Sequence, residues 1–336
     1  MKRLCFLVIC MSIIMGCSTS TSSTKALVDY VDPNIGTAHC RWFFYTPAAI
    51  PFGMAKLAPS TDAHLGNPGG WQAVGYDFRH TSIEGFANFH EFQVGGVVFA
   101  PTVGELQTVP GELENPDGGY RSRFDKKDEV AAPGYYSVLL KDYGVKAELT
   151  AMKRVGFHRY TYPKTEQANL IFDIGNKQGE SGEVKDAEVQ YFEDGRVEGY
   201  VITSPVYVNI YQKGADVRMY FSAVLNKKPV QVGTFVKDVV NPGKHQEKGP
   251  GAGLYMTFST EEQEAVEVKV GLSYTSIENA RFNRETEAAD VTFDQAKKNA
   301  TDVWNESLSR IYVEGGKETD LSLIHISEPT RQAEIS

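Results

Sequence analysis

The sequence lacks the features that mark a nucleic-acid partner. Its 336 residues carry a formal net charge of −9, and no run of Lys or Arg stands out along the chain. Proteins that bind a phosphate backbone concentrate Lys and Arg on one face, so we expect no nucleic-acid partner. A Walker loop, a dinucleotide-binding glycine fingerprint and a Gly-x-Ser-x-Gly elbow are absent too, which leaves nucleotide-binding and serine-hydrolase classes without support.

The sequence also has no long hydrophobic run. Its apolar run near the N-terminus is short. Two basic residues precede residues 4–15, an apolar run too short to span a bilayer as a stable helix. Ile14-Met15-Gly16-Cys17 then has the shape of a bacterial lipobox. We therefore predict a lipoprotein signal peptide over residues 1–16, with Cys17 as the lipidated residue. A plain signal peptide cut near Gly16 is the alternative.

Cysteine is scarce, with four residues in the whole chain. Cys5 and Cys10 would leave with the signal peptide and Cys17 would be acylated, so Cys40 alone remains and no intramolecular disulfide is expected. Residues 17–27 read as a polar tether, because Ser and Thr dominate them. Two or more acyl chains hold a protein on a membrane, so we expect an exported bacterial lipoprotein, periplasmic or at the cell surface, that is anchored without spanning.

Residues 28–275 have the pattern of an antiparallel β-sandwich. At 41% hydrophobic the chain can bury a core, and short apolar runs alternate with Gly, Pro and Asp turns. Asp194-Gly195 marks a tight hairpin between two of the expected strands. The expected strands are 135–140, 145–151, 156–162, 169–173, 190–192, 197–203, 206–212, 217–225, 253–259 and 265–273.

The pattern becomes helical after Ser276. Thr292 and Gln295 form a capping-box signature, and apolar residues then recur at helical spacing from Phe293 to Ile311. We interpret residues 276–320 as a helical connector. Such a helix could fold back on the sandwich, and a link to a further helical domain is equally natural.

We expect a different origin for the last sixteen residues. Residues 321–331 resemble the translation of a transposon adapter used in sequencing libraries, and residues 332–336 fit the index bases and flank that would follow. We expect residues 321–336 to be an adapter-derived artefact and leave them out of the fold.

Several segments in order resemble one known family. Together they resemble the N-terminal domain of glycosyl hydrolase family 92, the calcium-dependent exo-α-mannosidases, over about residues 30–320. The motifs are Asp32-Pro33-Asn34-Ile35-Gly36-Thr37, Pro51-Phe52-Gly53-Met54-Ala55-Lys56-Leu57-Ala58-Pro59, Gly75-Tyr76-Asp77, Gly85-Phe86-Ala87-Asn88-Phe89-His90, Glu148-Leu149-Thr150-Ala151 and Ser276-Ile277-Glu278-Asn279-Ala280-Arg281.

The resemblance implies an inverting hydrolase of α-mannoside glycans that uses calcium in the full-length protein. In that family the acid, the base and the calcium ligands lie mostly in an α/α toroidal barrel, which this chain lacks. The resemblance therefore implies no catalytic residue and no metal ligand in this chain. The chain would shape the substrate pocket and bind carbohydrate, and it would be inactive alone. The alternative is a non-catalytic glycan-binding lipoprotein that ends near Asp320, for which the apolar stripe of residues 293–311 would be unnecessary.

Trp71 and Asp77 are the first two expected substrate contacts. Trp71 lies in Gly69-Gly70-Trp71-Gln72, a turn that would expose the indole, and sugars stack on such aromatic planes. A Trp buried in the core is the alternative. Asp77 would accept hydrogen bonds from sugar hydroxyls; a local Asx turn is the alternative.

Four further residues complete the expected substrate site. The family's usual His-x-His-Leu is replaced here by Asn88-Phe89-His90-Glu91, and only the second His is kept. We expect His90 and Glu91 to contact substrate, with a structural role as the alternative for His90. His39 and Arg41, in an aromatic loop that departs from the family pattern, would meet a charged aglycone, since Arg pairs well with phosphate or carboxylate. A surface Arg without a ligand is the alternative for Arg41.

Overall fold

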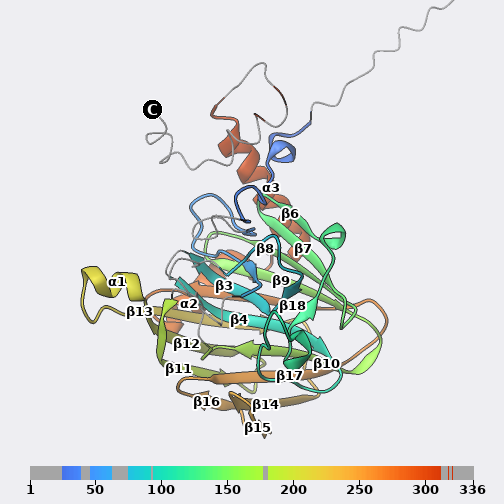
Figure 1. Cartoon of the computed structure of the whole chain (residues 1–336), viewed down its shortest axis with the longest axis vertical. Coiled ribbons are helices and arrows are strands. Elements are labelled where there is room, and N and C mark those ends of the chain that lie inside the picture. The colour runs from blue at the N-terminus through green and yellow to red at the C-terminus, as the bar shows by residue number, and fades with distance from the viewer. Residues whose placement is uncertain are drawn as a thin grey trace, which may run out of the picture.

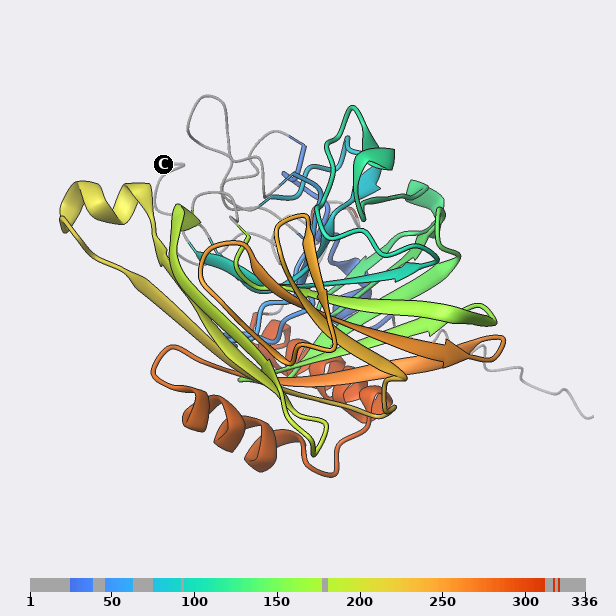
Figure 2. The ribbon, with the colours of Figure 1, turned by 90° about the horizontal axis from the view of Figure 1, so that it is seen from below.

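The computed structural model describes residues 25–38, 46–62, 75–91, 94–176 and 181–311, together with Lys317 and Asp320. Two large antiparallel sheets pack face to face in this part of the chain (Figures 1 and 2). This confirms the predicted β-sandwich. The helices with described bounds are three α-helices and three short 3-10 helices: α1 (Val206–Tyr211), α2 (Ile277–Ala288), α3 (Phe293–Leu308), η1 (Leu27–Tyr30), η2 (Pro116–Gly118) and η3 (Lys126–Asp128).

One sheet has seven strands and the other has nine. In spatial order the first contains β1 (Ala58–Ser60), β3 (Gly85–Glu91), β4 (Val94–Val103), β10 (Thr165–Asp173), β17 (Ala252–Thr260), β14 (Gln231–Val236) and β15 (Val239–Pro242). The second contains β16 (Gln246–Lys248), β11 (Glu183–Tyr191), β12 (Val197–Ser204), β13 (Val217–Leu225), β18 (Glu264–Ser273), β9 (Val155–Tyr162), β8 (Val145–Ala151), β7 (Tyr135–Leu140) and β6 (Val130–Ala132). The short strands β2 (Ser82–Ile83) and β5 (Ser122–Arg123) pair separately.

Strand β9 shows why the nine-stranded sheet is apolar on both faces. Tyr160 and Tyr162 point into the core between the sheets, whereas Val155 and Phe157 belong to a second apolar cluster with Phe293 of α3. Successive side chains of a strand face opposite sides, so one strand contributes to both clusters. The inner face forms the sandwich core, and the outer face receives the helices.

Helices α2 and α3 pack on the outer face of the nine-stranded sheet (Figure 2). The expected capping box at the start of α3 is present: Gln295 N donates to Thr292 Oγ1 at 3.3 Å, and Thr292 N donates to Gln295 Oε1 at 2.8 Å. Ala296 and Ala300 are fully buried against the sheet. The helix ends at Leu308, so Ile311 lies beyond it. The first part of the apolar stripe is therefore used by the sandwich itself, whereas Ile311 is 64% exposed.

The prediction of a strand over residues 206–212 is wrong. Residues Val206–Tyr211 form helix α1, which stands clear of the sheets in both views (Figures 1 and 2). The β-branched and aromatic composition favours a strand, but local side-chain bonds win. Asn209 Nδ2 donates to the carbonyls of Pro205 at 2.8 Å and Ala215 at 3.2 Å, and its Oδ1 accepts from Gly214 N at 2.9 Å. One amide thus closes the base of the projection.

The tight hairpin at Asp194-Gly195 is confirmed. It joins β11 to β12, whose residues Tyr191 and Val197 pair at its base, and Gly195 has a φ of 88°. Such a left-handed turn residue favours glycine. Among the described residues we found no helix with the length and hydrophobicity needed to cross a lipid bilayer.

Candidate functional site

Asp77 lies in a buried turn and holds a neighbouring arginine. Its Oδ1 accepts from Arg79 N and Nε, both at 2.9 Å, and its Oδ2 accepts from Arg79 Nη2 at 2.6 Å. Burial alone would raise the pKa of Asp77, but the hydrogen bonds from Arg79 outweigh burial and hold the pKa below its ordinary value. The carboxylate is ionised, and its bond to Arg79 N is that of an Asx turn. It presents a half-exposed guanidinium at the surface, with Arg79 62% exposed.

His90 and Glu91 lie at the end of the β3–β4 hairpin. His90 pairs with Gly95 and Glu91 pairs with Val94 across the two strands. The His90 side chain is buried, which lowers its pKa to about 3, and the positive charge of Lys56 adds to this effect. The imidazole is therefore neutral at physiological pH.

A buried arginine connects the segment beside the Asp77 turn with the start of β3. Arg121 Nη1 donates to the Thr61 carbonyl at 2.6 Å, and Nη2 donates to Glu84 Oε2 at 3.0 Å. Thr61 Oγ1 in turn accepts from Asp77 N at 3.1 Å. The Glu84 carboxylate also acts electrostatically on His90. These buried polar groups thus connect the Asp77 turn to Glu84, directly before β3, the strand that carries His90 and Glu91.

Arg121 was missed by reasoning from the sequence. It follows Gly119-Tyr120 and precedes Arg123 by two residues, and no spacing rule connects it with Glu84, which lies 37 positions away. Its guanidinium is fully buried, and a buried charge of this kind requires a carboxylate and several hydrogen bonds. Its role is to hold the segments that carry the candidate residues.

A second buried cluster surrounds Glu129. Its Oε1 accepts from the hydroxyls of Tyr76 at 2.8 Å and Tyr136 at 2.7 Å, and its Oε2 accepts from Lys126 Nζ at 2.8 Å. Burial raises the pKa of Tyr136 well above its ordinary value, and burial also lowers the pKa of Lys126. This cluster fixes Tyr76, which directly precedes Asp77.

Four of the predicted residues lie outside the described part of the chain. These are Trp71, His39 and Arg41 of the expected substrate site and Cys17, the expected lipidation site. Their roles stay predictions. So do the substrate contacts of Asp77, His90 and Glu91, which the structure places without a ligand.

The described residues do not fit the calcium that the resemblance implies. Within the described ranges, no three His, Cys, Asp or Glu side chains come together as a metal site would require. Calcium takes six to eight oxygen ligands, so a single paired carboxylate such as Asp77 or Glu84 is insufficient. We derive no step through calcium from these residues.

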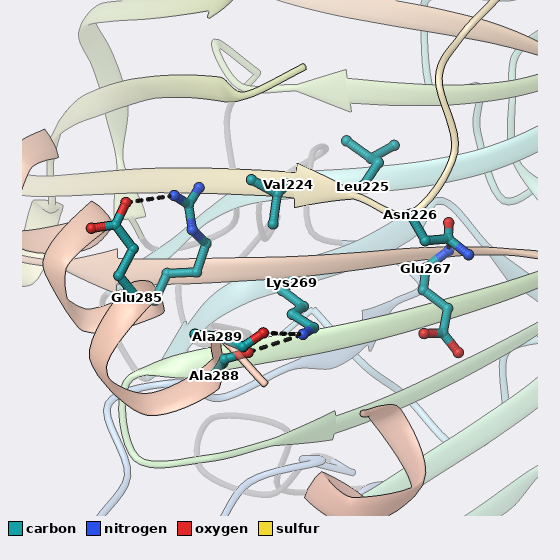
Figure 3. Close-up of a pocket in the computed structure, with 9 residues that line it drawn as sticks. Val224, Leu225, Asn226, Glu267, Lys269, Glu285, Ala288 and Ala289 are labelled. Atoms are coloured by element: carbon teal, nitrogen blue, oxygen red, sulfur yellow. Dashed lines mark hydrogen bonds and ion pairs between the residues drawn. The ribbon is translucent and has the colours of Figure 1, made fainter. Parts of the chain in front are cut away.

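A cavity of about 250 Å³ lies beneath the C-terminal half of α2, against β13 and β18 (Figure 3). Lys269 Nζ donates there to the carbonyls of Ala288 at 2.9 Å and Ala289 at 3.1 Å, and Arg284 pairs with Glu285 at 3.1 Å. None of the predicted substrate residues lines it. We interpret this cavity as the packing seam of α2.

Comparison with known protein families agrees with this fold, a sandwich of two antiparallel sheets with a helical pair on its outer face. The profile of the glycosyl hydrolase family 92 N-terminal domain matches residues 30–273. The chain therefore belongs to glycosyl hydrolase family 92 and contains its N-terminal domain. Among curated proteins, no match to the chain was found.

Solved structures of the same family share this fold. The GH92 α-mannosidase BT3965 from Bacteroides thetaiotaomicron is 28% identical, with a TM-score of 0.80 over 90% of this chain and 40% of that chain. It has also been solved in complex with mannoimidazole. The GH92 inverting mannosidase BT2199 from the same bacterium is 20% identical with a TM-score of 0.73, covering 90% of this chain and 39% of that one. The chain thus spans about 40% of the length of these relatives.

Proposed function

We propose that this chain is the N-terminal part of an exported α-mannosidase. The whole protein would remove terminal mannose from α-mannosides with inversion and with calcium. The observation that carries the proposal is the likeness to BT3965, which is 28% identical over 90% of this chain. A structure of BT3965 holds mannoimidazole, which supports α-mannoside glycans as the ligand class.

In this proposal the sandwich forms part of the wall of the substrate pocket. His90 is neutral and lies beside Glu91 at one hairpin end, and the buried Arg121 network connects the Asp77 turn with Glu84, directly before the strand that carries them. Trp71 would supply the aromatic plane for a sugar ring. His39 and Arg41 would meet the aglycone.

The catalytic acid and base would come from polypeptide outside this chain. Inversion needs two carboxyl groups roughly 6.5–9.5 Å apart, one protonated and one free to activate water. The most buried carboxylates near the candidate site are instead tied to cations: Asp77 to Arg79 and Glu84 to Arg121. Calcium would be bound outside the described residues as well. The chain alone would therefore be inactive.

Membrane attachment belongs to the same proposal. Lipidation at Cys17 and the tether of residues 17–27 would hold the enzyme on a bacterial membrane, in the periplasm or at the cell surface. The predicted signal over residues 1–16 would direct its export.

A glycan-binding lipoprotein without catalysis is the second candidate. We expected the apolar stripe of residues 293–311 to argue against it, because a stand-alone binder would not need the stripe. The structure weakens that argument, since Phe293, Ala296 and Ala300 are buried against the sandwich and only the end of the stripe is exposed. Activity must decide between the two candidates.

The test is to express the complete reading frame of the source locus and assay it on a chromogenic α-mannoside. The proposal predicts hydrolysis that a calcium chelator abolishes and added calcium restores, with β-mannose as the first product by NMR. The 336-residue chain is the control and should show glycan binding without turnover. A complete protein that binds mannosides but never cleaves them would favour the second candidate.

A further inference from the structure

Phe52 is displayed to solvent more fully than any other large apolar side chain in the described part of the chain. It is 93% exposed, in the turn that precedes β1. The turn is closed by a hydrogen bond from Gly53 N to the Ile50 carbonyl at 3.0 Å. Scattered apolar groups on a surface are ordinary, so exposure alone would carry no inference.

The backbone of Phe52 adds a second, independent observation. Its φ is 59°, in the left-handed region that favours glycine and asparagine. A bulky aromatic residue is strained there. Phe52 therefore combines an exposed side chain with a strained backbone. Asn or Gly at this position would relieve the strain and remove the exposed ring. Strained residues persist where the surrounding structure or a partner requires them.

The turn is held firmly on both sides. Before it, the Ala49 carbonyl accepts from the indole Nε1 of Trp304 at 2.7 Å. After it, the amides of Met54 and Ala55 donate to the Lys153 carbonyl at 2.7 and 3.2 Å. Phe52 is thus presented by a fixed frame between α3 and the β8–β9 turn.

The position of this frame points to what covers Phe52. Trp304 belongs to the last turns of α3, which ends at Leu308. Polypeptide that follows α3 therefore begins beside the turn that carries Phe52. The GH92 relatives continue well beyond the part that this chain matches, which is about 40% of their length.

We propose that Phe52 is a docking residue for the polypeptide that follows α3, inserting its ring into an apolar pocket of that part. The inference rests on the proposed function, because that polypeptide would be the catalytic part of the enzyme. A second copy of the chain and a lipid surface are the other occupants, and the test separates them.

The experiment compares Phe52→Asn in two settings: the 336-residue chain and the protein expressed from the complete reading frame. In the chain alone the substitution relieves strain without losing a contact, so Tm should rise by about 2–4 °C. In the complete protein the lost contact should outweigh this gain, and the Tm of the sandwich should fall. Val239→Asn, at a 60% exposed position on β15, is the control and should shift Tm equally in both settings.

A rise in Tm in both settings overturns the inference, and α-mannosidase activity in the same preparation would leave the proposed function standing. Two further results overturn it in favour of another occupant. One is concentration-dependent dimerisation of the chain, seen by sedimentation, that Phe52→Asn abolishes. The other is binding of the chain to phosphatidylcholine vesicles that the substitution abolishes. A reading frame that stops after the codon for Asp320 overturns both proposals.

Discussion

Acid should destabilise this domain through a histidine in its core. His158 is fully buried between the sheets, where its Nε2 lies 2.8 Å from Asn88 Oδ1 and its Nδ1 lies 2.8 Å from the Tyr160 hydroxyl. We assign the neutral tautomer in which Nε2–H donates to Asn88 and Nδ1 accepts from Tyr160. Burial lowers the pKa of His158 to about 3 from an ordinary 6.5.

The sign and size of the effect follow from linkage. The folded-state pKa is the lower one, so the unfolded chain binds the proton first as the pH falls. The contribution of neutral His158 to the free energy of unfolding is fully present above pH about 6.5. It decreases by about 1.4 kcal/mol per pH unit as the pH falls toward 3. At pH 4.5 this effect of His158 should therefore have lowered the free energy of unfolding by about 2.7 kcal/mol. A typical domain has a free energy of unfolding of roughly 5–15 kcal/mol, so the loss is a large share of it. His90, whose pKa is also about 3, should add a similar loss.

The variant His158→Gln isolates this contribution. An amide can still donate to Asn88 and accept from Tyr160 but does not titrate, so the variant should lose about 1–3 kcal/mol at pH 7.5. Urea unfolding followed by tryptophan fluorescence should then show a weaker dependence on pH between 6 and 4.5, by about 1.4 kcal/mol per pH unit. The exposed His245→Gln is the matched control and should follow the wild-type curve. Parallel curves for His158→Gln and wild type would refute the reasoning.

Three substitutions test other parts of the structure. Arg121→Met removes the guanidinium from the buried Glu84 and should lower the free energy of unfolding by about 3–5 kcal/mol. Adding Glu84→Gln should recover part of this loss in urea titrations, and a double variant no more stable than the single one would contradict it. Glu198→Gln removes the negative charge that binds Arg281 of α2 to the sheet. Hydrogen exchange of the backbone amides should therefore become faster in α2 and not in α3. Gly134→Ala places a Cβ 2.7 Å from that of Ala300 at a φ of 80°, and should lower the free energy of unfolding by about 1–3 kcal/mol, measured in urea.

The sandwich was readable from the sequence because its strands are regular. Strands β7 to β9 pair through short turns, and the hairpin at Asp194-Gly195 carries its own turn chemistry. Helix α1 was misread because its residues have strand propensity, while its geometry depends on Asn209, which bonds to Pro205 and Ala215. Hydrophobic periodicity in the sequence does not reveal hydrogen bonds of this kind.

Helix α2 and the candidate site were harder for a related reason. Helix α2 is attached by charge as well as by apolar contact: Arg281 donates twice to Glu198, at 2.8 and 2.7 Å, from 83 positions away. No apolar stripe announces that contact. In the candidate site, Asp77 and His90 were predicted from the family resemblance, but the buried Arg121, which connects the Asp77 turn with Glu84, has no sequence signature. Contacts between distant charged residues appear only once the sheets are assembled.

The most direct test of the central claim is to sequence the source locus past the codon for Asp320. The account predicts a reading frame that continues for several hundred codons, as the 40% coverage of the α-mannosidase BT3965 implies. That continuation should be mainly helical and should supply paired carboxylates. A native stop codon directly after Asp320 would contradict the account, and glycan binding by the sandwich alone would become the function to measure.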